Sequence, residues 1–165
     1  MKRFNQKGFT LVELLVVIAI IVVLAGVVVV VINPANLLAK GRDAKRIQDV
    51  ENLSKAVSLA LADGEITLLD NAGTDSATGT QALDGTNGYV TFAIPTGKQG
   101  LVKYIAALPV DPLNTAPSVY TYGAAAATGY EINTVLESPD NAAKMTTDGG
   151  NSDTIYEVGT DLTVL

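Results

Sequence analysis

An uncharged apolar run from Leu14 to Ile32 constrains this chain more than any other feature. It holds about 19 residues, and at a helical rise of roughly 1.5 Å per residue it spans about 29 Å, close to the hydrocarbon thickness of a bilayer. One carboxylate, Glu13, stands at its start, within the octet KGFTLVEL from Lys7 to Leu14. A charge costs about 2.5 to 3.5 kcal/mol at mid-bilayer on insertion scales. The run therefore predicts a membrane-crossing helix whose single charge needs either a partner or a shallow depth.

The octet resembles the N-terminus of type IV pilins and pseudopilins almost letter for letter. Precursors of that family carry a short basic leader, a glycine, and then Phe-Thr-Leu-Val-Glu-Leu at the start of a long apolar helix. The resemblance implies that residues 1–8 are a leader peptide, that a prepilin peptidase cuts between Gly8 and Phe9, and that Phe9 is then N-methylated. It also implies that Glu13 meets the terminal amine of an adjacent subunit during filament assembly.

Two settings for Glu13 stay open on chemical grounds. The amine on Phe9 would lie about one helical turn from Glu13, so each subunit would present a cation and an anion at neighbouring depths. Two charges that are costly alone in a low dielectric become tolerable as a pair. Alternatively, Glu13 lies among lipid headgroups, where its own helix N-terminus and its own amine stabilise it.

The flanking charges predict the orientation of the helix. Lys2, Arg3 and Lys7 precede the apolar run, which places the leader in the cytoplasm and sends residues after about 34 outward. A cluster of cations from Arg42 to Arg46 on the far side weakens this asymmetry. A cleaved secretory signal is disfavoured, because the run is longer than usual and no small-residue cleavage site follows it. We expect a single pass through the inner membrane, followed by a place in an extracytoplasmic or cell-surface filament.

A helix break is expected between Gly26 and Pro34. Gly26 is followed by five valines, whose stiff side chains lower helix stability. Pro34 lacks a backbone donor and biases Asn33 away from helical angles, so Asn33 would cap, and Pro34 would open, a second helix. One hypothesis is local melting of this stretch in a filament; the alternative is a simple kink in a membrane helix.

Residues 34–64 read as an amphipathic helix. Ile47, Val50, Leu53, Val57 and Leu61 recur at spacings of three and four, which predicts one buried face. We expect the other faces to be solvated, with some of their charges turned toward neighbouring subunits in a filament. The polar residues on these faces are Arg42, Asp43, Lys45, Arg46, Gln48, Asp49, Glu51, Asn52 and Lys55.

Residues 65–165 predict a small globular head. Residues 70–88 are rich in Gly, Thr, Asn and Asp and read as a long loop, and residues 101–108 have helical spacing. Alternation predicts strands at 89–94, 118–122, 130–137 and 155–158. The fold class is therefore α+β: a long N-terminal helix, apolar over residues 9–33 and kinked near Pro34, packed on a small antiparallel sheet. Tyr120, Tyr122 and Tyr130 are expected in the core rather than on a ligand surface.

Composition excludes several functions. The chain contains no histidine and no cysteine, which removes the commonest general base, thiol nucleophiles and nearly all zinc sites. No segment pairs carboxylates in a catalytic setting, and no Gly-rich phosphate motif lies between a strand and a helix, so we expect neither an enzyme nor a catalytic residue. The formal net charge is −6, and loss of the three leader cations makes it about −9. This acidity opposes nucleic-acid binding.

Without cysteine, something other than a disulfide must hold residues 138–153. The segment LPVDP at 108–112 and the segment YEINTVLES at 130–138 resemble, more loosely, the head of major pseudopilins, which use a C-terminal calcium site for this purpose. Asp148, Asn151 and Asp153 offer hard oxygen ligands for such an ion. Their spacing does not match an EF-hand loop, and Asp/Asn/Gly clusters are ordinary turn chemistry. No other cofactor is expected.

The sequence thus predicts a structural subunit of a type IV pilus-like filament, stored in the membrane and processed by a peptidase. Its expected partners are further copies of itself, the prepilin peptidase, and the assembly platform with its ATPase. A pseudopilin of a type II secretion or competence system is one alternative. A membrane-anchored extracytoplasmic binding module that never polymerises is another, and a plain anchor of that kind needs neither cleavage at Gly8 nor a polymer-dependent role for Glu13.

Overall fold

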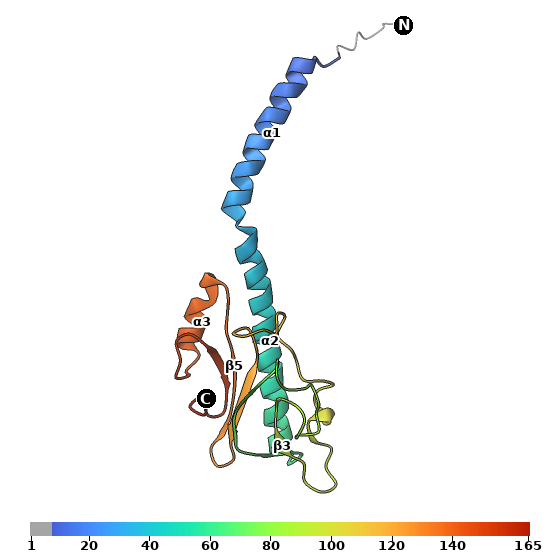
Figure 1. Cartoon of the computed structure of the whole chain (residues 1–165), viewed down its shortest axis with the longest axis vertical. Coiled ribbons are helices and arrows are strands. Elements are labelled where there is room, and N and C mark those ends of the chain that lie inside the picture. The colour runs from blue at the N-terminus through green and yellow to red at the C-terminus, as the bar shows by residue number, and fades with distance from the viewer. Residues whose placement is uncertain (1–7) are drawn as a thin grey trace, which may run out of the picture. The chain divides into compact units, whose positions relative to one another are not determined.

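The computed structural model describes residues 8–165, so the predicted leader charges Lys2, Arg3 and Lys7 lie outside the described residues (Figure 1). The chain divides into two compact units, Met1–Leu38 and Ala39–Leu165. Helix α1 spans Leu11–Ile32 in the first unit. It ends where Asn33 adopts the left-handed conformation, with φ 46°. Helix α2 spans Pro34–Ala62, and the Asn36 amide donates to Oδ1 of Asn33 at 3.4 Å.

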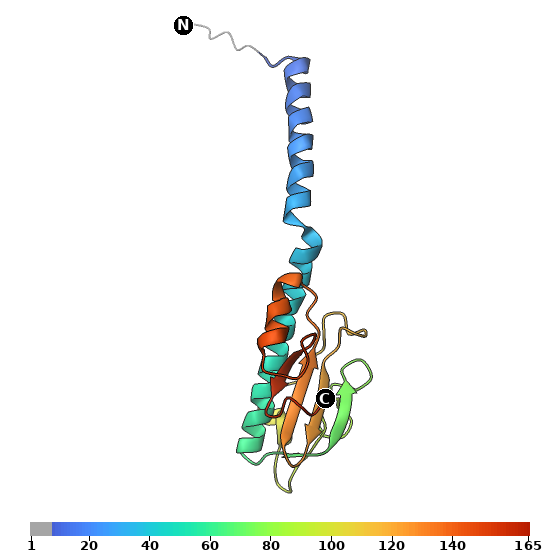
Figure 2. The same cartoon turned by 90° about the vertical axis from the view of Figure 1, so that its left-hand side faces the viewer.

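The second unit is built on the buried face of α2. Val50, Leu53 and Val57 are completely buried, while Ile47 and Leu61 are half-buried. The apolar stripe that the sequence predicts is therefore confirmed. Four strands cover this face as an antiparallel sheet in the order β2-β4-β5-β6 (Figures 1 and 2). The strands are β2 (Asn71–Asp75), β4 (Thr121–Ala125), β5 (Gly129–Thr134) and β6 (Tyr156–Gly159).

Shorter elements complete the head. Strand β1 (Thr67–Leu68) pairs with β3 (Phe92–Ala93) in a separate two-stranded sheet. Two 3-10 turns lie at Gly100–Lys103 and Pro139–Asn141, and the short helix α3 spans Ala142–Thr147. The predicted α+β class, a long N-terminal helix followed by a small antiparallel sheet, is confirmed.

Several local predictions for the head are wrong. The expected loop at 70–88 contains β2, because Asn71, Thr74 and Asp75 pair with β4, although asparagine and aspartate have low strand propensity. The expected strand at 89–94 shrinks to β3, the strand expected at 118–122 begins only at Thr121, and the strand expected at 130–137 ends at Thr134. The expected helix at 101–108 is only a 3-10 turn. The strand bounds depend on which residues find a partner strand.

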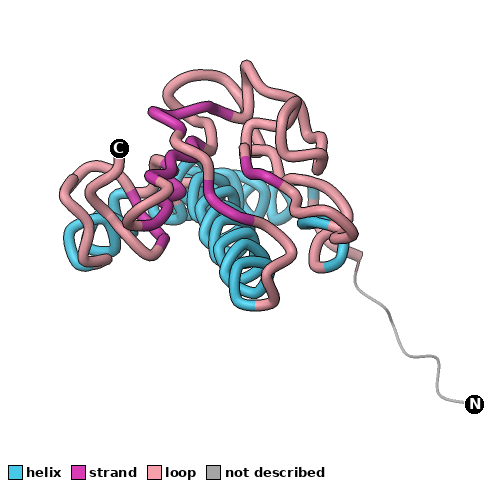
Figure 3. The backbone as a smooth tube through the Cα atoms, turned by 90° about the horizontal axis from the view of Figure 1, so that it is seen from below, coloured by secondary structure: helices cyan, strands magenta, loops and turns pink. Residues whose placement is uncertain are grey.

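The tyrosines lie in the core, as predicted. Tyr120, Tyr122 and Tyr130 are completely buried in the core. Figure 3 shows the backbone of the head from below, with helices, strands and loops in different colours. The Tyr130 hydroxyl donates to the Ser54 carbonyl at 2.7 Å and lies 2.7 Å from the Ser58 hydroxyl. The Tyr120 hydroxyl donates to Asp49 at 2.9 Å. These bonds satisfy polar atoms that burial would otherwise make costly.

The predicted solvated face of α2 is wrong at Asp43 and Arg46, both of which are completely buried. The Arg46 guanidinium donates to Asp111 from Nε at 2.5 Å and from Nη2 at 3.1 Å. Its Nη1 donates to Asp43 at 3.1 Å and lies 2.5 Å from a Glu137 oxygen. The charges are tolerated because a planar guanidinium can engage several carboxylates at once.

Asp43 also fixes the chain that follows the sheet. Its carboxylate accepts the backbone N–H groups of Glu137 at 2.8 Å and Ser138 at 2.9 Å, and the side-chain amide of Asn141 at 2.9 Å. The start of the cysteine-free segment 138–153 is therefore held to α2 by buried hydrogen bonds.

Candidate functional site: the N-terminal helix and its charge

Gly8, Phe9 and Thr10 precede α1 in non-helical backbone and are exposed. Phe9 is 91% exposed, and a Cβ added at Gly8 would meet nothing within 4 Å. Thr10 has φ −81° and ψ 154°, an extended conformation. The Gly8–Phe9 bond at which the sequence predicts cleavage is therefore not shielded by the residues that the structure describes.

Thr10 and Glu13 form a capping box at the start of α1. The Glu13 amide donates to the Thr10 hydroxyl oxygen at 3.3 Å, while the Thr10 amide and hydroxyl both donate to Oε2 of Glu13 at 2.8 Å. Two backbone amides that a helix start leaves unpaired are thereby satisfied. Glu13 is thus held at its own helix N-terminus by one oxygen, while no bond to its Oε1 occurs within residues 8–165.

The surface of α1 is apolar and open. The stretch Leu11–Val29 has a mean hydropathy of 3.2 and is long enough to cross a membrane, and none of it is buried within the chain. Large apolar side chains such as Val22 (70% exposed) are left largely uncovered by residues 8–165. An exposed apolar area of this extent marks a surface that lipid or another protein covers.

The two residues expected to bracket a helix break lie in different surroundings. Gly26 is inside α1, which continues in helical geometry to Ile32, and a Cβ at Gly26 would meet nothing within 4 Å. Pro34 is the first residue of α2. Loss of helicity between them in a filament stays a prediction.

The three candidate calcium ligands do not form a common site in this structure. Asp148 accepts the backbone N–H of Gly150 at 3.0 Å and of Glu157 at 2.9 Å. Asn151 donates its side-chain amide to the Leu165 carbonyl at 3.3 Å, and Asp153 is exposed. Within residues 8–165, no group of three or more acidic side chains is arranged so that it could hold a metal ion. The Asp148 carboxylate thus binds backbone amides of its own turn and of β6, and calcium binding by these three residues stays a prediction.

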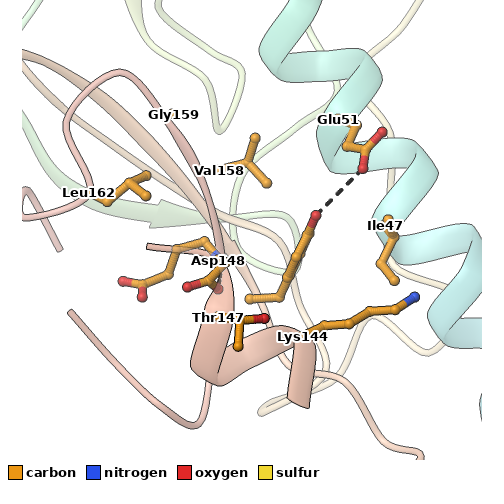
Figure 4. Close-up of a pocket in the computed structure, with 10 residues that line it drawn as sticks. Ile47, Glu51, Lys144, Thr147, Asp148, Val158, Gly159 and Leu162 are labelled. Atoms are coloured by element: carbon orange, nitrogen blue, oxygen red, sulfur yellow. Dashed lines mark hydrogen bonds between the residues drawn. The ribbon is translucent and has the colours of Figure 1, made fainter. Parts of the chain in front are cut away.

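A hollow of about 500 Å³ lies on the head between α2, α3 and β6 (Figure 4). Ile47 and Glu51 line it from α2, and Lys144 and Thr147 line it from α3. Across it the Tyr156 hydroxyl donates to Glu51 at 3.5 Å.

Comparison with known proteins identifies the N-terminus. The family described as the prokaryotic N-terminal methylation motif matches residues 3–29, which include the octet, Glu13 and most of α1. This segment carries the prepilin leader motif of type IV pilins and pseudopilins, and the motif points to a structural subunit. No curated protein and no solved structure matches the chain. The motif implies processing by a prepilin peptidase and filament assembly.

The predictions from the sequence do not include two structural features, the capping box of α1 and the pairing of Arg46 with Asp111. The pattern Thr10-x-x-Glu13 before an apolar run is a known signature of a helix start, and it predicts the capping box. The ion pair between Arg46 and Asp111 could not be predicted, because the two residues lie far apart in the chain and no local pattern relates them.

Proposed function

We propose that this protein is a structural subunit of a type IV pilus-like filament, assembled by packing of its N-terminal helices. The observation that carries the proposal is α1 itself. It is a membrane-length apolar helix that the described residues leave unburied, and it has a single carboxylate in its first turn. A helix with these properties suits lipid before assembly and other copies of the same helix afterward.

The capping box explains how Glu13 can serve in both settings. Before cleavage, the two bonds from Thr10 to Oε2 satisfy the carboxylate locally. Cleavage between Gly8 and Phe9 creates an amine one residue before Thr10, and methylation keeps its positive charge. Oε1 of Glu13 then accepts the amine of a neighbouring subunit, because an ion pair in a low dielectric costs less than two separate charges.

The location of the precursor before assembly is inferred from the same helix. The precursor crosses the inner membrane once, with its leader in the cytoplasm and residues 39–165 outside. The prepilin peptidase removes the leader, and an assembly platform with its ATPase moves subunits from lipid into the growing filament. This transfer loses little hydrophobic stabilisation, because α1 exchanges one apolar environment for another.

Glu13→Val tests the role of the charge. We expect normal amounts of the variant in the membrane fraction but at least a tenfold loss of sheared filaments, measured by immunoblot and electron microscopy. Glu13→Gln, which keeps the size and removes the charge, should behave in the same way, whereas Leu15→Val should assemble like the wild type. Wild-type filament yield in both Glu13 variants would refute the pairing.

Mass spectrometry of the mature N-terminus tests the processing step. We expect sheared filaments to contain chains that begin at a methylated Phe9. Mature protein that retains residues 1–8 and occurs only as single copies in the envelope would instead indicate a non-polymerising anchor.

A further inference from the structure

The outer face of the head's sheet, which points away from the core, carries buried polar side chains. All six residues of β5 are buried. The side chains that β5 and β6 direct toward the core are Tyr130, Ile132, Tyr156 and Val158. Because side chains alternate along a strand, Glu131, Asn133 and Glu157 project from the opposite, outer face.

Two later segments of the chain cover this outer face. They are the loop at 148–153 and the final segment at 160–165. Glu131 is 0% exposed and Glu157 is 2% exposed, although both carry a carboxyl group. Backbone amides of the final segment bind Glu131, and a backbone amide of the loop binds Glu157.

One oxygen of each carboxyl group makes these bonds. Oε2 of Glu131 accepts the N–H groups of Val164 and Leu165, each at 2.9 Å. Oε2 of Glu157 accepts the Ser152 N–H at 3.0 Å. The two carboxyl groups thus fasten both covering segments to the sheet.

Strand register makes the two carboxyl groups neighbours. Asn133 lies directly across from Glu157, and Glu131 lies two residues before Asn133 on the same face of β5. Diagonal cross-strand positions of this kind are about 7–8 Å apart, within reach of two long side chains. The covering segments also meet, because the Asn151 side-chain amide in the loop donates to the Leu165 carbonyl at 3.3 Å.

Three oxygens on the outer face have no hydrogen-bond donor. Oε1 of Glu131, Oε1 of Glu157 and Oδ1 of Asn133 are buried without a partner. The other buried side-chain oxygens without partners in the described chain, on Tyr122 and Thr134, belong to the core face of the sheet by strand alternation. Buried acceptors without a donor are costly, so this face lacks at least one proton donor.

No cation pairs with the two carboxyl groups. In the described part of the chain, none of the ion pairs includes either residue. The charged side chains of the covering segments are all acidic, namely Asp148, Asp153 and Asp161. The neighbouring strand β4 places only Thr121 and Gly123 opposite Asn133 and Glu131. Two buried carboxylates in such surroundings are strongly unfavourable.

One lysine lies in the hollow beside β6. Lys144 from α3 and Glu51 from α2 line this hollow together with Glu157. Figure 4 shows the Lys144 side chain directed toward Ile47 on α2. The Glu157 carboxyl group is bound instead by Ser152 of the covering loop.

We propose that the folded head holds one proton on the carboxyl pair Glu131 and Glu157, and that loss of this proton at alkaline pH releases the segments that cover the pair. A protonated carboxyl group is neutral and carries an O–H donor, whereas two ionised groups offer acceptors only. The proton, taken up from water, therefore lowers the buried charge and supplies a donor to one of the free oxygens. This device concerns the single chain and does not depend on filament assembly.

The direction of the pH dependence follows from linkage. Burial raises the pKa of Glu157 above its ordinary value of 4.5, the Ser152 N–H opposes this shift, and the neighbouring Glu131 adds to it. Because the folded pKa is the higher one, the stabilisation is complete below about pH 4.5 and is lost as the pH rises through the raised value. The pair titrates as a unit, so either carboxyl group can carry the proton.

Thermal unfolding of the full-length protein in detergent between pH 5 and pH 9 tests the proposal, with EDTA present so that no divalent cation contributes. We expect the wild-type midpoint to fall by roughly 5 °C or more over this range. Glu157→Gln, a neutral mimic of the protonated acid, should lose less than half as much and should unfold at a higher temperature than the wild type at pH 9. Asp153→Asn, the matched control in the covering loop, should follow the wild type.

Hydrogen exchange measures the release of the covering segments. The reporter amides are those of Ser152, Val164 and Leu165, which donate to the pair. We expect their protection factors, corrected for the intrinsic exchange rate, to fall at least tenfold between pH 6 and pH 8 in the wild type. Protection of Val57 in the core of α2 should stay constant, and in Glu157→Gln the reporter amides should not respond to pH.

Two results would overturn the proposal. If the wild type and Glu157→Gln lost the same number of degrees between pH 5 and pH 9, the pair would hold no proton. If the midpoint fell in the wild type alone but the reporter amides stayed protected, the proton would not control the covering segments.

Carbon-13 NMR of the glutamate carboxyl groups in the wild type keeps the test decisive if Glu157→Gln does not fold. We expect a carboxyl group of the pair to ionise at a higher pH than every other glutamate of the head. Ionisation of both Glu131 and Glu157 at or below the ordinary glutamate value would contradict the proposal.

Discussion

Helix α1 and strand β5 reverse the usual relation between hydropathy and burial. Every side chain from Leu11 to Val29 is exposed within the chain, although this is the most apolar stretch of the sequence. In β5 all six residues are buried, including a glutamate and an asparagine. Hydropathy measures whether a side chain prefers an apolar environment to water. Burial within the single chain also requires that another part of the chain covers that side chain.

The difference separates two tasks. The head closes on itself, and it buries Asp43 and Arg46 only because Asp111 and Glu137 complete the network. The described residues of the head leave helix α1 uncovered, and in the proposed function lipid and other subunits cover it. Substitutions in the head should therefore change the stability of the single chain, and substitutions in α1 should change assembly alone.

The largest expected effect on stability is that of Arg46→Met. Removal of the guanidinium leaves Asp43 and Asp111 buried without their cation, which should lower the free energy of unfolding by about 3 to 5 kcal/mol. Lys45→Met, next to it on the exposed face of α2, should change it by less than about 0.5 kcal/mol. Urea titration followed by tyrosine circular dichroism measures both. Equal losses in the two variants would mean that the buried network adds nothing.

Acid should destabilise the head through Glu137. Hydrogen bonds from Arg42, supported by Arg46 and opposed by burial, lower the pKa of Glu137 from 4.5 to about 2. Because the folded pKa is the lower one, the stabilisation is complete above about pH 4.5 and is lost as the pH falls toward 2.

Comparison with Glu137→Gln isolates this contribution. The wild type should lose roughly 2 kcal/mol more of its unfolding free energy between pH 5 and pH 2 than the variant does. The variant should also be less stable at pH 7. Parallel pH profiles of the two proteins would show that Glu137 is not coupled to folding.

The smallest effect on the single chain is expected from Gly26→Ala. A Cβ there meets nothing within 4 Å, so the unfolding midpoint of the head should stay within about 1 °C of the wild type. Alanine favours helix by up to about 1 kcal/mol, so a filament that needs local melting after residue 26 should assemble less well. A destabilised head would show that α1 contributes to the fold of the single chain.

Features with a strong local signal could be predicted from the sequence. The apolar run at 14–32 predicted α1, and the apolar spacing of three and four predicted the buried face of α2. The octet KGFTLVEL predicted the prepilin motif. Features that depend on distant pairing could not. Strand β2 forms in a polar stretch only because β4 lies beside it, and Glu131 is buried only because residues 160–165 cross the outer face.

By itself, the sequence determined the membrane-length apolar helix, its single carboxylate and the prepilin motif, because these depend on composition and short-range spacing along one helix. Only the tertiary structure decided which charges of the head are buried, which segments hold its cysteine-free end, and which oxygens are left without a donor. Those outcomes depend on residues that are brought together from distant parts of the chain. The sequence around a polar side chain does not indicate whether a distant residue will form a hydrogen bond or an ion pair with it.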